Sequence, residues 1–431
     1  MRRLSALSAL ALCACALPPS RSNGAYERGA LRASAPLAPP VQAAPLEPER
    51  LAFPTTVRVR LEAVQRRALV EVVLADGHPI TVRRVGDDVV ASTGQRGRSV
   101  TLTAPTDGAL RLGGNAYPGA LTFSAHPASG LAVYNEAPLE GYVAGVVASE
   151  LSIWSAPPAE LEAQAIAART YALGQLSHRA RERALVELVD GVQDQAYRGL
   201  YQANNASTRA IAERLDAAVR ATHGMVLMRG DQLEEARFHA SCGGHTASFA
   251  DIFTEPGFDP GPTGAPCPPC QERAQREAAA GQPDAKRPLG WRVTVPHEAL
   301  ARAGKALGLG GAILAVAPKR LDASGRWLDA QVRGPKGLTV IPYDDLRRAL
   351  GYGVVKGARL VRAVPAFGQP IRSGLVLEGL GRGHGVGLCQ EGARDLARDG
   401  WSAEQILALY YPGARIERAS EGRAIHAAAR R

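Results

Sequence analysis

The chain has 431 residues, of which 46% are hydrophobic and 21% charged. This composition is normal for a globular protein and too apolar for a wholly disordered chain, and no run approaches the roughly 18 apolar residues that suggest a membrane-spanning helix. Lysine and arginine outnumber aspartate and glutamate by 51 to 41, and six of the ten excess charges lie in residues 1–50 and 414–431. The rest of the chain is too weakly basic for a dedicated nucleic-acid binder but suits contact with an anionic polymer.

The first residues indicate export. Arg2 and Arg3 precede an apolar run, the order typical of a secretory signal peptide. We therefore expect a signal peptide over residues 1–17 and a protein of the periplasm or cell envelope. Residues 12–15, of sequence LCAC, are similar to a bacterial lipobox, which would make Cys15 a lipidation site and a lipid the only membrane contact. Plain signal cleavage at or beyond the end of this motif is the alternative.

The pattern after the signal predicts an α+β protein. Residues 18–50 are rich in Pro, Ala, Ser and Arg, which predicts a disordered linker. Residues 51–133 should form a β-rich region, because short apolar runs alternate there with turn signals; the predicted strands are 56–61, 69–74, 89–92, 99–102 and 121–123. We expect the main domain over 134–416, with an exposed proline-rich insertion at 256–290, and a basic tail over 417–431.

Helical spacing begins at Leu139. This residue forms an amphipathic stripe with Val143, Val146 and Val147. Three further helices are expected. Proline in the first turn indicates one from 158 to about 175, glycine after the last turn indicates one from about 208 to 223, and a capping box at 402–405 indicates one from 402 onward. Further strands are expected at 225–228, 234–239 and 291–295.

Glu150 falls in the middle of the apolar stripe if the first helix extends that far. Its carboxyl group would then face the interior, and burial would raise its pKa and make it suitable as a general acid. Alternatively the helix ends near Ala148 and Glu150 faces solvent.

Ordered motifs in the chain resemble the stage II sporulation protein D (SpoIID)/LytB family. The first three are YNEAPLEGYV, GVVASE and EAQAIAARTYA, the next is QAYRG, and the last three are FHASCGGHT, GRGHGVGLCQEGA and QILALYYPG. They lie at 134–143, 145–150, 162–172, 195–199, 238–246, 381–393 and 405–413.

The resemblance implies a lytic transglycosylase that cuts MurNAc–GlcNAc bonds in peptidoglycan, with Glu150 as the single acid/base. Protonation of the glycosidic oxygen would open the bond, and the carboxylate would then accept the proton of the sugar's C6 hydroxyl to close a 1,6-anhydro ring. This chemistry needs no second carboxylate, so Asp190 and Asp194 receive no role as nucleophile. Some relatives are called amidase enhancers, so the alternative is a non-catalytic wall-binding partner of an N-acetylmuramoyl-L-alanine amidase.

Seven residues of the matching motifs are candidates for substrate binding, because they are polar or aromatic groups that can contact sugars. They are Arg169, Tyr171, Gln195, Tyr197, His239, His384 and Gln390. The alternative for Arg169 is that it only extends outward from a buried alanine stripe. The glycines at 381–387 lack the flanking strand, helix and acidic residue of a dinucleotide site.

The cysteines indicate a structural cluster. Cys267 and Cys270 form a C-x-x-C pair, and Cys242 together with His239 or His245 would complete a zinc site. A disulfide between Cys267 and Cys270, or between Cys242 and Cys267, is the alternative in an exported protein.

Metal-binding members of the family carry Cys and His just before the Q-x-Y motif, where this chain has DGVQD at 190–194. That site is therefore not expected here, and the proposed reaction requires no cofactor.

Cys389 stands where the family often has serine, so we expect a small buried residue there.

Overall fold

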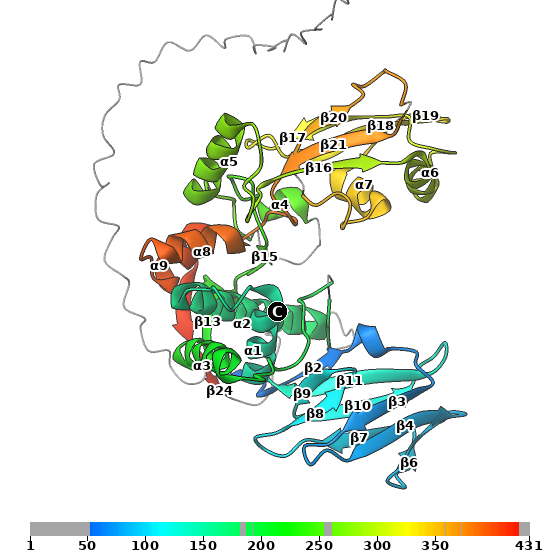
Figure 1. Ribbon diagram of the computed structural model, residues 1–431, viewed down its shortest axis with the longest axis vertical. Helices are drawn as coiled ribbons and strands as arrows, with labels where there is room; N and C mark the ends of the chain where they lie inside the picture. The colour runs from blue at the N-terminus through cyan, green and yellow to red at the C-terminus, as the bar shows by residue number, and fades with distance from the viewer. Residues whose placement is uncertain are drawn as a thin grey trace, which may run out of the picture. The chain divides into compact units, whose positions relative to one another are not determined.

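The computed structural model describes residues 52–181, 187–191, 193–253, 261–357, 359–371 and 373–421 (Figure 1). Helices and mainly antiparallel sheets both occur in this part of the chain, which confirms the expected α+β class. None of its helices is both long and apolar enough to cross a membrane. The signal peptide, the lipidation site Cys15 and the linker predicted for residues 1–50 lie outside the described ranges.

Two sheets form the N-terminal region, as the alternation of apolar and polar residues predicts. In β7 (Ser99–Thr103), Val100 and Leu102 are buried while the residues around them are exposed, the pattern of a strand with one face on a core. One sheet has the order β12-β2-β11-β10-β7, with β2 (Thr56–Arg60), β10 (Ala120–Ala125), β11 (Leu131–Pro138) and β12 (Leu188–Val189). The other has the order β6-β5-β4-β3-β8-β9, with β3 (Leu69–Val73), β4 (Pro79–Val85), β5 (Asp88–Ala91), β6 (Arg96–Gly97), β8 (Ala109–Leu112) and β9 (Asn115–Pro118).

Three helices follow these sheets: α1 (Leu139–Glu150), α2 (Pro158–Arg181) and α3 (Ala206–Ala221). Helix α1 is buried on most sides because it packs against β2, β11, α2 and α3. Helix α3 starts two residues earlier than predicted, because Asn205 and Thr208 form a reciprocal capping box. Helix α2 runs past the predicted end near 175 and supports the site along much of its length.

Short strands connect distant parts of the chain. β13 (Met225–Arg229) lies between β14 (Gln232–Leu233) and β23 (Arg415–Arg418), β15 (Phe238–His239) pairs with β22 (Leu388–Cys389), and β1 (Ala52–Phe53) pairs with β24 (Ser420–Glu421). Of the strand predicted over 234–239, only the last two residues form β15. Residues 417 to 421 were predicted as the start of the basic tail, but all except Ala419 lie in β23 and β24, and Glu417 is buried.

The region from 290 to 380 contains a core of its own, of which the sequence predicted only the first strand. Trp327 and Tyr343 pack there with ring centroids 5.5 Å apart. Two three-stranded sheets and two helices build it: β16 (Gly290–Val295), β20 (Arg359–Val364) and β21 (Leu375–Leu380); β17 (Ala315–Leu321), β18 (Trp327–Gly334) and β19 (Gly337–Pro342); α6 (His297–Ala306) and α7 (Tyr343–Leu350).

The remaining helices are α4 (Phe249–Ile252), α5 (Pro268–Ala280), α8 (Gln390–Arg398) and α9 (Ala403–Tyr410). Helix α9 begins at the predicted capping box of Ser402 and Gln405. Helix α5 lies in the segment predicted as an exposed insertion, but it packs on α8 and buries Cys270 and Arg273. A buried ion pair between Arg394 and Glu160, with Nε–Oε2 at 2.9 Å, joins α8 to α2.

Candidate functional site

Glu150 is the last residue of α1, so the helix does extend to the carboxyl group that the stripe placed toward the interior. One carboxylate oxygen accepts a hydrogen bond from the backbone N–H of Ala196 at 2.7 Å, and the side chain of Gln390 bonds to the same carboxyl group. Burial raises the pKa of Glu150 above its ordinary value, although these two hydrogen bonds oppose the rise. Glu150 is only partly buried, so its proton remains reachable.

The loop over residues 195–199 holds this carboxyl group because it packs tightly on α1. A Cβ atom added to Gly145 would lie 2.5 Å from Cε2 of Tyr197 and 2.6 Å from the carbonyl oxygen of Gly199, so only glycine lets the loop approach this closely. Ser149 strengthens the contact, since its hydroxyl accepts a bond from the N–H of Arg198 at 3.1 Å. The Q-x-Y-x-G motif thus positions the Ala196 N–H against Glu150.

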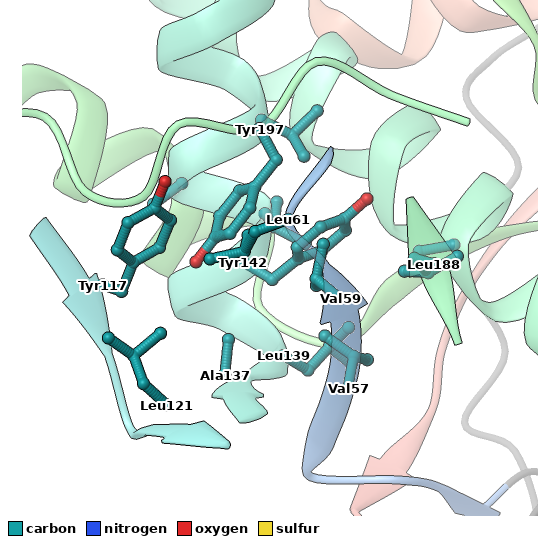
Figure 2. Close-up of a cluster of buried hydrophobic side chains, with 14 of the residues drawn as sticks. Val57, Val59, Leu61, Tyr117, Leu121, Ala137, Leu139, Tyr142, Leu188 and Tyr197 are labelled. Atoms are coloured by element: carbon teal, nitrogen blue, oxygen red, sulfur yellow. The ribbon is translucent and has the colours of Figure 1, made fainter. Parts of the chain in front are cut away.

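Gln195 and Tyr197 are buried parts of this packing. The hydroxyl of Tyr142 donates to Gln195 Oε1 at 2.9 Å, and the hydroxyl of Tyr197 donates to Asn135 Oδ1 at 2.7 Å. Figure 2 shows Tyr142 and Tyr197 side by side among buried aliphatic side chains, and their ring centroids are 4.9 Å apart. These contacts give both predicted substrate ligands a role in the core.

Arg169 is fully buried and forms a bidentate ion pair with Glu140, with distances of 2.8 and 2.5 Å. It also donates to the carbonyl of Met225 at 3.0 Å. Its donors therefore bind α1 and the start of β13 to α2, which favours a structural role over the predicted contact with sugar.

Tyr171 is also buried on α2. Its hydroxyl lies 3.4 Å from Asp194, and its ring packs edge-on to Phe238. Burial raises its pKa. Asp194 itself pairs with Arg179 at 2.7 Å, so it is a structural carboxylate, consistent with giving it no role as nucleophile.

Gln164 lies near the candidate acid and was not among the predicted site residues. It lies on α2 with 1% of its surface exposed, and its Oε1 atom receives a long contact of 3.4 Å from Gln390 Nε2. Its own Nε2 is buried and has no hydrogen-bond partner within the described ranges. The signal was present in the sequence, as a glutamine in an otherwise alanine-rich helical stretch.

His239 and His384 lie next to each other, with ring centroids 5.6 Å apart. Nδ1 of His239 lies 3.1 Å from the carbonyl of Val386, and Nε2 of His384 lies 2.9 Å from the carbonyl of Phe238, so each of these nitrogens donates. Burial lowers the pKa of His239 to about 3 and that of His384 well below its usual value. Both rings are therefore neutral at physiological pH.

Trp154 was also missed. It lies in the loop after α1 and is 67% exposed. The carbonyl oxygens of Ile153 and Trp154 accept bonds from Arg214 at 3.0 and 3.2 Å, so α3 holds this loop in place. An exposed aromatic face on a fixed loop can stack on a sugar ring.

The cysteine cluster differs from the predicted ligand set. Cys389 supplies the fourth sulfur, although we expected only a small buried residue there, and the four free, buried thiols of Cys242, Cys267, Cys270 and Cys389 lie within 4.8 Å of one another. The two predicted histidines have other contacts, since Nδ1 of His245 lies 2.7 Å from the carbonyl of Thr246 and His239 bonds to Val386.

Comparison with known proteins finds one family model and several relatives that are similar to this chain. The family model "Stage II sporulation protein" (SpoIID) matches residues 128–228, which include Glu150 and its supporting loop. The chain is 28% identical to Stage II sporulation protein D of Bacillus subtilis over 315 residues, covering 70% of this chain and 82% of the relative. It is also 28% identical to an uncharacterized protein of Brachyspira hyodysenteriae, covering 72% and 75% respectively, and 27% identical to Stage II sporulation protein D of Bacillus amyloliquefaciens, covering 65% and 75%. Residues 128–228, with Glu150 and its loop, are thus similar to the SpoIID family.

Proposed function

We propose that the protein acts on the bacterial cell wall as a lytic transglycosylase, with Glu150 as its single acid/base. The observation that carries the proposal is the placement of this carboxyl group. Burial raises its pKa, it accepts a hydrogen bond from a backbone N–H at 2.7 Å, and it is still partly open to solvent.

The hydrogen bonds at Glu150 suit both halves of the reaction. Its protonated form donates to the glycosidic oxygen as the bond to the leaving sugar breaks. The carboxylate that results is stabilised by the Ala196 N–H and by Gln390, and it then accepts the proton of the C6 hydroxyl as the anhydro ring closes. The proton that enters the leaving group is replaced by the proton of the hydroxyl, so no water is consumed.

Substrate contacts are assigned to polar and aromatic groups around this carboxyl group. Gln390 and Gln164 form a pair of amides beside Glu150. Gln390, which is 8% exposed, is assigned the contact with the sugar, and Gln164, which is 1% exposed, supports it. Trp154 provides a stacking face on the loop that follows the acid. His239 and His384 are neutral groups at β15, and we assign them contacts with the part of the glycan that extends past this strand.

The experiment is the substitution Glu150→Gln, which keeps the shape of the side chain but removes its proton. Cleavage of purified peptidoglycan should fall by at least ~100-fold, whereas pelleting with insoluble peptidoglycan should be unchanged. The variant should be no less stable at alkaline pH, because burial disfavours the charged carboxylate that the substitution removes.

Glu136→Gln is the matched control. Its carboxylate lies 3.6 Å from Arg58 on a partly exposed strand, where a surface pair contributes little, so activity should be retained. Near-normal turnover by Glu150→Gln would overturn the assignment of Glu150 as the acid, whereas no cleavage by the folded wild type would favour the wall-binding amidase enhancer.

We further propose that the chain is exported and anchored through Cys15. Cys15→Ala should then move the protein out of the membrane fraction, because an acylated cysteine would supply most of its membrane affinity. Unchanged fractionation together with no lipid label on the wild type would exclude the anchor.

A further inference from the structure

Four cysteine sulfurs converge at one buried point from three separate parts of the chain. Cys242 follows β15, Cys267 and Cys270 lie at the start of α5, and Cys389 precedes α8. Each residue is at most 1% exposed. All four sulfurs lie within 4.8 Å of one another, and Cys270 Sγ is 3.7 Å from Cys389 Sγ.

These distances fit one tetrahedral metal ion. A Zn–S bond is about 2.3 Å long, so the edge of a ZnS₄ tetrahedron is about 3.8 Å, close to the separation of Cys270 and Cys389. A disulfide has its sulfurs about 2.05 Å apart. Two disulfides would bring each sulfur close to one other sulfur, whereas here every sulfur lies near the other three.

The surroundings of the sulfurs suit thiolates. Cys389 Sγ accepts from the backbone N–H groups of Cys242 and Gly392 at 3.3 and 3.4 Å, and Cys242 Sγ accepts from that of Gly244 at 3.3 Å. Cys267 and Cys389 are the N-cap residues of α5 and α8, helices of 13 and 9 residues, so the positive ends of two helix dipoles face the cluster. Backbone donors that bond to the sulfurs in this way stabilise metal-bound thiolates.

Neighbouring residues leave room for the four sulfurs and hold the cysteine-bearing helix α8 in place. A Cβ atom on Gly392 would lie 2.6 Å from Cys267 Sγ, so a side chain there would intrude among the sulfurs. Arg273 on α5 pairs with Glu391 on α8 at 3.0 Å, and Arg287 pairs with Asp395 at 2.6 Å. The first pair joins the two cysteine-bearing helices, and the second joins α8 to the segment that follows α5.

We propose that Cys242, Cys267, Cys270 and Cys389 bind one structural zinc ion as four thiolates. The four thiols release their protons to solvent when the ion binds, and no electron transfer is involved. A closed four-sulfur shell leaves no position for water or substrate, so the ion does not take part in the reaction.

The site also connects to the candidate acid. Gln390, which bonds to Glu150, directly follows Cys389, so the ion would fix the turn that presents Gln390. This consequence rests on the proposed function, whereas the metal content does not. Gln390 would act here as a positioning residue for Glu150.

The test is the metal content of the full chain purified under reducing conditions. Native mass spectrometry and elemental analysis should find about one zinc per chain, and all four thiols should resist alkylation until a chelator is added. Cobalt(II) exchanged into the protein should give the visible absorption of a tetrahedral thiolate complex. Zinc removal should lower the thermal unfolding temperature.

Serine variants locate the ligands. Cys389→Ser and Cys270→Ser should each weaken zinc binding by at least ~10-fold. Ser241→Ala is the matched control, because this buried hydroxyl beside Cys242 has no hydrogen-bond partner in the described part of the chain, and it should retain zinc fully. If the serine variants fail to fold, the wild-type measurements decide alone.

Three results would overturn the proposal: a metal-free protein with the mass deficit of one or two disulfides, four alkylatable thiols in the metal-free native protein, or stoichiometric iron in place of zinc. A zinc-loaded protein that does not cleave glycan would refute the proposed function and leave the zinc site standing.

Discussion

Gly145→Ala tests how the site is held in place. The added methyl group would lie 2.5 Å from the ring of Tyr197 and 2.6 Å from the carbonyl of Gly199, both far inside van der Waals contact. Overpacking of this kind costs about 1–3 kcal/mol. The loop over 195–199 must move away from α1, and the 2.7 Å bond from Ala196 N–H to Glu150 is then weakened.

Urea unfolding and glycan cleavage measure the two effects. We expect the free energy of unfolding to fall by about 1–3 kcal/mol, and kcat/KM in the folded fraction to fall by about tenfold, as expected for loss of one hydrogen bond of about 1.4 kcal/mol. Gly174→Ala is the control: it lies within α2, its added Cβ meets nothing within 4 Å, and alanine should stabilise the helix by up to about 1 kcal/mol. The account of the loop fails if Gly145→Ala is as stable and active as the wild type.

Three other predictions concern buried charges. Arg169→Ala should lower the free energy of unfolding by about 3 kcal/mol, because it leaves Glu140 without its bidentate partner; a loss below about 1 kcal/mol in urea titration would contradict the structural role. Glycan cleavage should decline as pH rises through the raised pKa of Glu150, since the acid must start protonated; a rate that increases across neutral pH would contradict it. Asp190 has a pKa raised by burial from 3.8 to about 6, so the folded state holds the extra proton and stability should fall as pH rises through that window. Asp190→Asn should flatten this part of the profile of unfolding temperature against pH, and an unaltered profile would exclude Asp190 as its source.

Local signals in the sequence predicted the helix that carries the candidate acid. The stripe from Leu139 to Val147 predicted α1, and Glu150 proved to be its final residue. The capping box at Ser402 likewise predicted the start of α9. Both features depend on residues within a few positions of one another, where helical geometry fixes which side chains meet.

Long-range partners could not be predicted in this way. Arg169 pairs with a glutamate 29 residues away, and Tyr197 bonds to an asparagine 62 residues away, so the motif spacing did not reveal these buried partners. Cys389 lies 119 residues from Cys270 and joins the cluster only because β22 pairs with β15. The close approach at Gly387, where an added Cβ would lie 2.0 Å from the carbonyl of Arg237, explains the glycine-rich motif that leads into β22.

Digestion of purified peptidoglycan in H₂¹⁸O, followed by mass spectrometry of the products, tests the central claim most directly. A lytic transglycosylase closes the anhydro ring without water, so the new glycan ends should be 1,6-anhydro sugars that carry no ¹⁸O. Glu150→Gln should release almost none of them. New reducing ends labelled with ¹⁸O would identify a hydrolase, and the absence of new glycan ends from the folded wild type would contradict glycan cleavage altogether.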